Sequence, residues 1–200
     1  MSKTHLAILG ALALATPAIA GGDGLGRGDG VLDLTAGYAT PGSDLDYYDS
    51  GAALGVHYYY HVTPRLGLGA GLESSSFSWE QTYNFYGIPS SNTQDLDVLS
   101  AGPFVRVVMN PASRFRAYVA SGITYNRRTW SGTYFSIHGD GPAFRYTEVK
   151  AGAVAAGGFE AELSRRVLLG AEARFGYLDL KTGDGRETQT TLALRLGYRF

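Results

Sequence analysis

The chain has 200 residues, of which 44% are hydrophobic and 18% are charged, which is too apolar for a disordered protein. Its net charge of -1 gives no support to nucleic-acid binding, and its lack of cysteine excludes disulfides, a thiol nucleophile and cysteine-ligated zinc. No run of about 18 apolar residues follows residue 20, so a membrane-spanning helix is excluded, although a membrane protein of another kind is not.

Residues 1–20 have the layout of a secretory signal peptide. Lys3 gives them a basic start, residues 6–15 are apolar, and the Ala-Ile-Ala sequence at 18–20 supplies the small residues of a cleavage site. The apolar run is too short to cross a bilayer. We therefore expect residues 1–20 to be removed and the mature chain to begin at Gly21, outside the cytoplasm.

Residues 21–30 read GGDGLGRGDG and predict a flexible, glycine-rich periplasmic leader. A phosphate-binding loop would need a strand before it and a helix after it, and the sequence offers neither. The triplet Arg27-Gly28-Asp29 leaves an adhesion motif open, but a flexible leader is the preferred interpretation.

Beyond residue 30 the chain alternates between apolar side chains and a second set that is rich in glycine, alanine and single charges. The alternation recurs in eight segments, which are 32–38, 52–62, 66–73, 99–109, 115–126, 148–163, 167–177 and 192–200. A period of two predicts strands with two unlike faces. Pro103, inside the fourth segment, cannot donate a ladder hydrogen bond, so we expect a bulge or a local break near it.

The composition of the two faces separates a soluble sandwich from a membrane barrel. Glycine, alanine and single charges suit the crowded interior of a small closed barrel, and the apolar face then meets lipid. Lipid admits no open sheet edge, so the strands must close on themselves. Short connections alternate with long ones, as periplasmic turns alternate with extracellular loops. The sequence predicts an all-β, eight-stranded antiparallel up-and-down transmembrane β-barrel over residues 31–200, in the bacterial outer membrane.

Aromatic residues on the apolar faces gather near the ends of the predicted strands. Such girdles mark the two membrane interfaces of outer-membrane barrels, whereas a soluble sandwich gives no reason for this sorting. The expected membrane girdle comprises Tyr58, Tyr60, Phe115, Tyr198 and Phe200 at the periplasmic end, and Tyr38, Tyr125, Phe175 and Tyr177 at the outer end.

The last segment ends Leu192-x-Leu-x-Leu-x-Tyr-x-Phe200, and the stretch before it includes Gly158-Phe159-Glu160 and Glu172-Ala-Arg174. These features resemble the final hairpins of small eight-stranded outer-membrane barrels, including the opacity-type adhesins and the transmembrane barrel of outer membrane protein A. The resemblance implies that the outer-membrane assembly machinery recognises the strand ending at Phe200, and that lipopolysaccharide surrounds the barrel. No periplasmic peptidoglycan-binding domain follows Phe200, so the anchoring role of such a domain is not expected.

Ten charged residues fall on the predicted interior face, with five of each sign. They are Glu73, Arg106, Arg116, Glu148, Lys150, Glu160, Glu162, Glu172, Arg174 and Arg195. Unpaired charges in a narrow interior are costly, so we expect a network of ion pairs that keeps the barrel closed. A path for ions or small solutes is the alternative. The sequence predicts no metal site and no cofactor.

The long outer loops hold many aromatic residues. The candidates for a surface contact are Phe77, Trp79, Tyr83, Phe85, Tyr86, Trp130, Tyr134 and Phe135. The period-two spacing from Phe77 to Phe85 indicates that two strands continue above the membrane as a ribbon. These rings could bind a partner surface, pack on one another as a rigid cap, or lie against lipopolysaccharide.

The sequence leaves three candidate functions. The preferred one is a non-enzymatic outer-membrane barrel with a structural, adhesive or protective role through its long extracellular loops, which leaves a surface ligand open. The alternative is a narrow channel or carrier for small solutes. The third is a lipid A deacylase that uses Ser136 and His138 with Glu148, which the loop position of the first two residues makes the weakest of the three.

Overall fold

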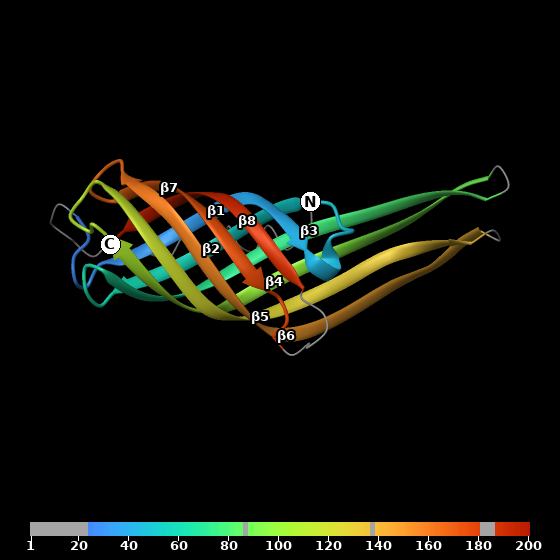
Figure 1. Ribbon diagram of the computed structural model, residues 1–200, viewed down its shortest axis with the longest axis horizontal. Helices are drawn as coiled ribbons and strands as arrows, with labels where there is room; N and C mark the ends of the chain where they lie inside the picture. The colour runs from blue at the N-terminus through green and yellow to red at the C-terminus, as the bar shows by residue number, and fades with distance from the viewer. Residues whose placement is uncertain (1–23, 86–87, 137–138, 181–186) are drawn as a thin grey trace.

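A computed structural model describes residues 24–85, 88–136, 139–180 and 187–200. The alternating segments form eight antiparallel strands that follow one another in chain order and close into a barrel (Figure 1). β1 pairs with β8 from Val31↔Arg199 to Gly42↔Thr188, which closes the ring. The predicted eight-stranded antiparallel up-and-down barrel is confirmed. The strands are β1 Gly30–Gly42, β2 Gly51–His61, β3 Leu66–Phe85, β4 Ile88–Met109, β5 Phe115–Ser136, β6 Gly139–Glu162, β7 Val167–Tyr177 and β8 Thr188–Arg199.

The two ends of the barrel differ in construction. Short turns join β2 to β3, β4 to β5 and β6 to β7, and we call this the turn end. At the opposite loop end, β3 to β6 run on as two long hairpins, while β1, β2, β7 and β8 stop near the barrel (Figure 1). The four long strands have 20, 22, 22 and 24 residues, and the others have 11 to 13.

The long hairpins replace two of the predicted loops. β3 and β4 stay paired up to Phe85↔Ile88, as the period-two spacing of the aromatic residues indicated. β5 and β6 stay paired up to Ser136↔Gly139 with one register shift, where the sequence predicted one of the long connections, between the segments 115–126 and 148–163. Threonine and aromatic residues are frequent in this stretch, and they favour strands.

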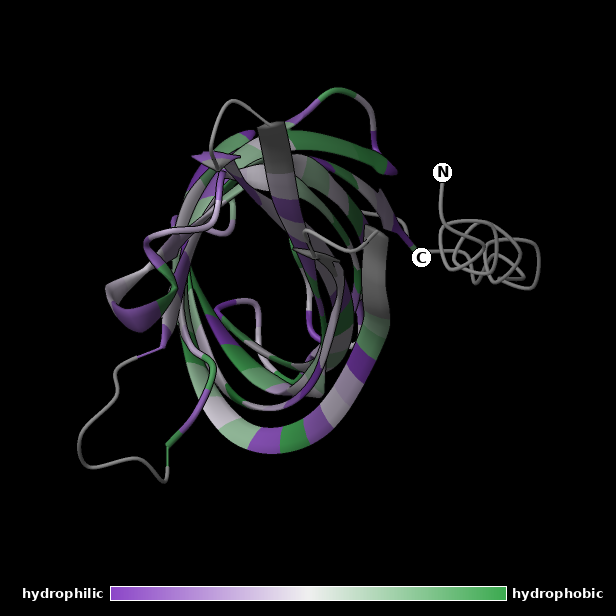
Figure 2. Cartoon of the chain, turned by 90° about the vertical axis from the view of Figure 1, so that its right-hand side faces the viewer, coloured by the Kyte–Doolittle hydropathy of each residue, from purple (hydrophilic) through white to green (hydrophobic). Residues whose placement is uncertain are grey.

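The two faces of the strands alternate as predicted. On β1, the side chains of Asp33 and Thr35 are buried inside the barrel, while Leu32 and Leu34 are partly exposed on the outside. The outside of β8 is also apolar and exposed, with Leu194 at 69% exposure. The strands form a continuous ring when the barrel is viewed along its axis (Figure 2). An apolar outer wall of this kind is stable in hydrocarbon rather than in water.

Two adjacent glycines on β6 show how tightly the interior is filled. A Cβ on Gly158, which faces inward, would lie 2.6 Å from the Tyr118 hydroxyl oxygen and would also overlap the Ala171 carbonyl. A Cβ on Gly157, which faces outward, would meet nothing closer than 3.9 Å. The interior therefore requires glycine where the wall does not, because large interior side chains press against the backbone.

Pro103 does not shift the register of its strand. β4 pairs with β5 at Ala101↔Tyr125 and again at Phe104↔Gly122, which is the same register on both sides of the proline. Pro103 and Gly102 have no pairing to β5, although both pair with β3. The expected disturbance is thus a local break in one ladder, and no bulge accompanies it.

The end of the leader packs under the barrel. The sequence predicted a flexible leader over 21–30, of which the structure describes residues from 24 onward. Leu25 is buried, and its backbone N–H donates to the Pro111 carbonyl at 3.0 Å. The Gly28 N–H donates to the His61 carbonyl at 2.8 Å. These contacts fix residues that composition alone marked as mobile. The signal peptide expected at 1–20 lies outside the described residues.

The only helical turn among the described residues is the 3-10 turn η2, Ser43–Leu45, between β1 and β2. Within the same residues, no helix is long and apolar enough to cross a membrane.

Leu194→Arg tests which side of the wall meets lipid. Leu194 lies between Ala36 and Ala171 in mid-barrel, so an arginine there should lower the free energy of unfolding by about 2–4 kcal/mol in vesicles. Leu163→Arg is the control, since Leu163 is similarly exposed, at 63%, but follows the end of β6 at the turn end. Urea unfolding should show a cost of about 1 kcal/mol or less for the control. Equal costs for the two variants would contradict the assignment.

Candidate functional site

A cluster of charged side chains fills the turn half of the barrel interior, and Glu160 on β6 lies at its centre. Its carboxylate accepts from Arg195 Nη1 at 2.7 Å, from Arg116 Nε at 3.0 Å and from Arg106. Each of these side chains is almost completely buried. Three arginines from three other strands therefore converge on one carboxylate, which ties β4, β5, β6 and β8 together.

Two further carboxylates balance the remaining arginine charge. Asp33 on β1 forms ion pairs with Arg195 and, at 3.7 Å, with Arg106. Glu162 forms ion pairs with Arg116 and with Arg199, each at 3.3 Å. Asp33 and Arg199 were not among the predicted interior charges. Both alternate with the apolar residues of a predicted segment, so the period of two already placed them on the interior face.

Tyr118 joins this cluster to a second one nearer the loop end. Its ring lies between two guanidinium groups, with Arg106 Cζ at 3.9 Å and Arg195 Cζ at 4.8 Å from the ring centroid. Its hydroxyl donates to Glu172 at 2.8 Å. Glu172 in turn forms an ion pair with Arg174. Cation–π contacts and a charge-assisted hydrogen bond thus connect the two layers of charge.

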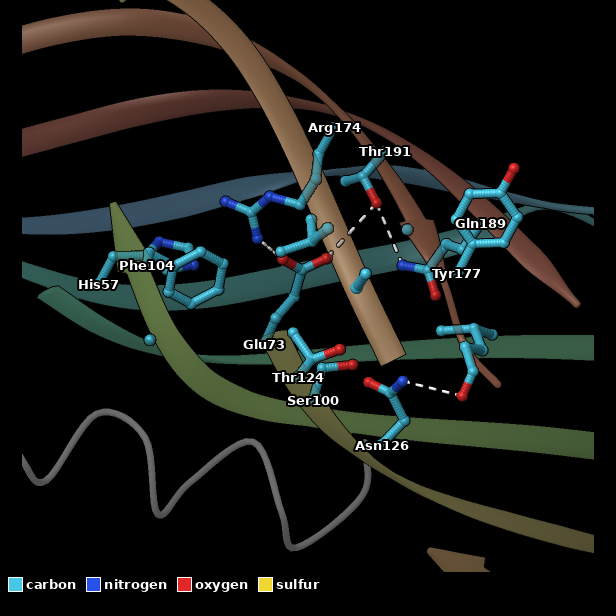
Figure 3. A pocket seen from close by; sticks show the side chains of 15 residues that line it. His57, Glu73, Ser100, Phe104, Thr124, Asn126, Arg174, Tyr177, Gln189 and Thr191 are labelled. Atoms are coloured by element: carbon cyan, nitrogen blue, oxygen red, sulfur yellow. Dashed lines mark hydrogen bonds and ion pairs between the residues drawn. The ribbon is translucent and has the colours of Figure 1, made fainter. Parts of the chain in front are cut away.

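A small cavity of about 30 Å³ lies beside this second layer (Figure 3). Arg174 forms an ion pair with Glu73 at its edge, and Glu73 accepts a hydrogen bond from Thr191 at 3.4 Å. Asn126 donates to the Leu178 carbonyl at 2.9 Å on the far side. This volume suffices for a few water molecules and is far below the several hundred Å³ of a typical ligand pocket.

A third group of charges lies at the loop end of the interior. Arg128 forms ion pairs with Glu148, with Glu187 and, at 3.9 Å, with Asp179. Lys150 contacts Asp179 at 2.8 Å and Glu148 at 3.7 Å. The side chains of Glu148 and Lys150 are partly exposed, unlike the deeper charges. All ten predicted interior charges therefore lie in ion pairs, and the structure adds others to them.

Apolar clusters pack beside the charged side chains toward both ends of the barrel. At the loop end, the connection between β1 and β2 folds inward, and its Leu45 and Tyr48 pack with Phe77, Leu96 and Leu178. Burial raises the pKa of the Tyr48 phenol, which favours its neutral form in this cluster. At the turn end, a second cluster comprises Leu25, Val31, Val108, Tyr118 and Leu168.

Two histidines on β2 face the interior. His57 and His61 are almost completely buried, and neither ring nitrogen of His61 has a hydrogen-bond partner among the described residues. The His57 ring makes an edge contact with Phe104, at 5.7 Å between centroids. Across the described residues, no group of three or more histidine, aspartate and glutamate side chains could hold a metal ion.

The predicted surface aromatics divide into two groups. Phe77 is buried in the loop-end cluster, and Trp79 and Trp130 pack against that cluster. Tyr83 is exposed further out on β3. Tyr146 is exposed on β6 and lies against Trp130, with 5.6 Å between ring centroids. Four predicted residues have side chains outside the described part of the chain, namely Phe85, Tyr86, Tyr134 and Phe135.

The predicted girdle residues lie on the outer wall. Tyr58, Tyr60 and Phe115 are exposed near the turn end, while Tyr198 and Phe200 are half-buried and contact each other edge to face. The other group lies nearer the loop end, and all its members are exposed; it comprises Tyr38, Tyr125, Phe175 and Tyr177.

The residues of the hydrolase alternative do not form a described site. His138 lies outside the described residues, as does the side chain of Ser136. The third member, Glu148, forms ion pairs with Arg128 and Lys150.

Glu160→Gln should be among the most damaging single changes in the interior. It removes the charge that three buried arginines share, and removing one partner of a buried ion pair costs about 3–5 kcal/mol. Urea unfolding in vesicles measures the loss. Glu148→Gln is the matched control at the partly exposed loop end, where we expect about 1 kcal/mol or less. An interior that tolerates both changes equally would contradict the central position of Glu160.

Comparison with known proteins adds to the geometry. A family model described as the outer membrane protein beta-barrel domain matches residues 6–200. No curated protein matches the chain.

Several solved structures share the fold. Neisserial surface protein A is 15% identical, with a TM-score of 0.61 over 86% of this chain and 99% of that one. Ail, the attachment invasion locus protein of Yersinia pestis, solved with the heparin analogue sucrose octasulfate, is 15% identical, with a TM-score of 0.57 over 87% and 99%. OprG of Pseudomonas aeruginosa is 14% identical, with a TM-score of 0.53 over 89% and 98%. The matched family model and the closed eight-stranded sheet lead to one conclusion: the chain belongs to the outer membrane protein β-barrel family, whose place is the bacterial outer membrane.

Proposed function

We propose that this chain is a closed, non-enzymatic barrel that carries a binding surface outside the cell. The observation that supports it most is the unequal length of the strands, since β3 to β6 have 20 to 24 residues and the other four have 11 to 13. About 9–11 tilted residues cross a bilayer. The surplus in the four long strands then stands beyond the outer leaflet as a sheet-built projection.

The inward-facing side of this projection offers aromatic rings and amides for the contact. Tyr83 and Tyr146 are 40% and 58% exposed, and Trp79 and Trp130 beside them are partly buried. Tyr83 donates a hydrogen bond to Gln81, which fixes the phenol. Large rings held by a sheet bury much area on binding at a small entropic cost, which is why tyrosine and tryptophan are enriched in interfaces.

The barrel itself serves as the anchor in this proposal. Paired charges and two apolar clusters occupy its interior, which supports a closed structure over a wide pore. The same proposal includes export through residues 1–20 and recognition of the strand that ends near Phe200 by the assembly machinery. It also includes contact of the wall with lipid and lipopolysaccharide.

One structural neighbour supports a surface ligand of some kind. Ail is described in complex with a heparin analogue, which is a polyanion. The outward face of the projection of this chain instead mixes the acids Glu80, Asp95 and Asp97 with Arg127 and Arg145, so it offers no uniformly basic surface to a polyanion. We therefore place the contact on the aromatic inner side, and propose a ligand of low negative charge.

A double variant tests the binding surface. The assay measures how strongly bacteria with the chain on their surface bind to epithelial cells, or to a panel of immobilised matrix proteins and glycans. Tyr83→Ala with Tyr146→Ala should lower this binding by at least about tenfold, since two anchor rings are lost. Tyr38→Ala with Tyr125→Ala removes two tyrosines from the outer wall and should leave binding within about twofold. Equal binding by both double variants, or equal loss in both, would contradict the proposal.

Conductance distinguishes the closed anchor from the alternative channel. The refolded protein in a planar bilayer should give no steady conductance above that of the lipid, because paired charges and two apolar clusters occupy the interior and the cavity beside them measures only about 30 Å³. Regular single-channel steps would favour the solute channel. Release of fatty acid from lipid A by the purified protein would argue for the enzyme.

A further inference from the structure

The turn end of the barrel carries exposed positive charge that the proposed function does not use. Each of the three short turns has an arginine directly before the strand that follows, the last turn has a second one, and the packed leader adds a fifth. We call these five residues the arginine rim: Arg27, Arg65, Arg114, Arg165 and Arg166. Four of their side chains are exposed, and that of Arg166 is half-buried.

No carboxylate neutralises the rim within the described residues. None of its guanidinium groups has an ion-pair partner there, in contrast to the arginines of the interior. Asp29 lies at the same end, but its carboxylate accepts from the Gly26 N–H at 2.7 Å. Glu162 is already shared by Arg116 and Arg199. The rim is therefore a region of unbalanced positive charge.

The backbone holds the turn arginines rigidly in place. The carbonyls of Arg65, Arg114 and Arg166 accept from the N–H groups of Val108, Glu162 and Arg199, at 2.7, 2.7 and 2.8 Å. Each of these arginines thus forms the last rung of the ladder to a neighbouring strand.

A hydroxyl group in each turn adds to this support. Thr63, Ser113 and Ser164 accept from the first N–H of the next strand, at 3.0, 3.2 and 3.2 Å. The same device in all three turns places the arginines at one level around the barrel.

That level is the membrane interface. Phe115 of the turn-end girdle directly follows Arg114, and Arg166 Nη1 donates to the hydroxyl of the girdle residue Tyr198 at 3.2 Å. The apolar side chain of Leu163 is exposed in the turn that carries Arg165 and Arg166. Aromatic girdles lie at the headgroup level, so the guanidinium groups beside them reach the phosphates of the lipids.

We propose that the arginine rim binds the phosphate groups of anionic phospholipids in the inner leaflet of the outer membrane. With short turns on the periplasmic side, as in the family, the rim faces that leaflet. Guanidinium groups bind phosphate through two parallel hydrogen bonds, and each basic residue near an anionic surface contributes about fivefold to binding. The loop end has more exposed acids than exposed arginines, with Asp44, Asp46, Glu80, Asp95 and Asp97 against Arg127 and Arg145. The preference is therefore built into one end of the molecule.

Native mass spectrometry of the folded protein in a non-ionic detergent tests this assignment. The probes are phosphatidylglycerol and phosphatidylcholine with identical acyl chains, and the readout is the ratio of their adducts. Arg65→Gln with Arg114→Gln should lower the preference for phosphatidylglycerol by about 25-fold, at about fivefold per arginine. Arg127→Gln with Arg145→Gln removes two exposed arginines at the loop end and should change the ratio by less than about twofold.

Further arms separate the outcomes. Arg65→Lys with Arg114→Lys keeps the charge and should retain most of the preference, and it replaces the glutamine variant if that variant fails to fold by gel mobility and circular dichroism. Inorganic phosphate should compete no better than chloride at equal ionic strength; effective competition would assign the rim to free phosphate and overturn the lipid proposal. An unchanged ratio in the rim variants, or an equal fall in the loop-end control, would overturn it as well.

Discussion

The whole interior depends on the pairing of charges that have no water to solvate them. Glu160 holds three arginines from three other strands, and Asp33 and Glu162 complete their neutralisation. Desolvating so many ions costs several kcal/mol for each, so the network is stable only when every member is present. The same crowding explains why Gly158 must lack a side chain, since the ring of Tyr118 that lies between two of these arginines occupies the space. Such a network specifies one register for the strands it joins.

Apolar packing toward both ends of the barrel surrounds this network of ion pairs. Apolar clusters lie above and below the charges, and one of them includes the connection between β1 and β2 while the other includes the end of the leader. A low local dielectric strengthens every ion pair between them. In our proposal the barrel is therefore an anchor, and the two hairpins and the exposed rim at the turn end are its accessible features. Those are the places where we put recognition.

The period of two predicted the fold because it reports directly which side chains face which environment. It found the eight strands, the ten interior charges that lie in ion pairs, and the hairpin of β3 and β4. It missed Arg128 because the fifth predicted segment ended at residue 126, before the strand does; its partner Glu148 lies across from it on β6, and Asp179 and Glu187 lie in the connection between β7 and β8. The packing of Leu25 under the barrel was missed because a glycine-rich composition says nothing of what a single leucine will contact. The hairpin of β5 and β6 was hidden because polar residues interrupt its apolar alternation.

The projection rises from one side of the barrel only. β3 to β6 continue while β1, β2, β7 and β8 stop, so half of the circumference ends close to the bilayer (Figure 1). From Tyr125 at the outer girdle to the end of β5 at Ser136, an extended strand covers roughly 35 Å. The inner surface of the projection therefore faces the space above β1, β2, β7 and β8, which no strand of the barrel covers. A large molecule that approaches from that flank meets the aromatic rings without having to enter the barrel, whereas one arriving from the opposite flank meets the charged outer face.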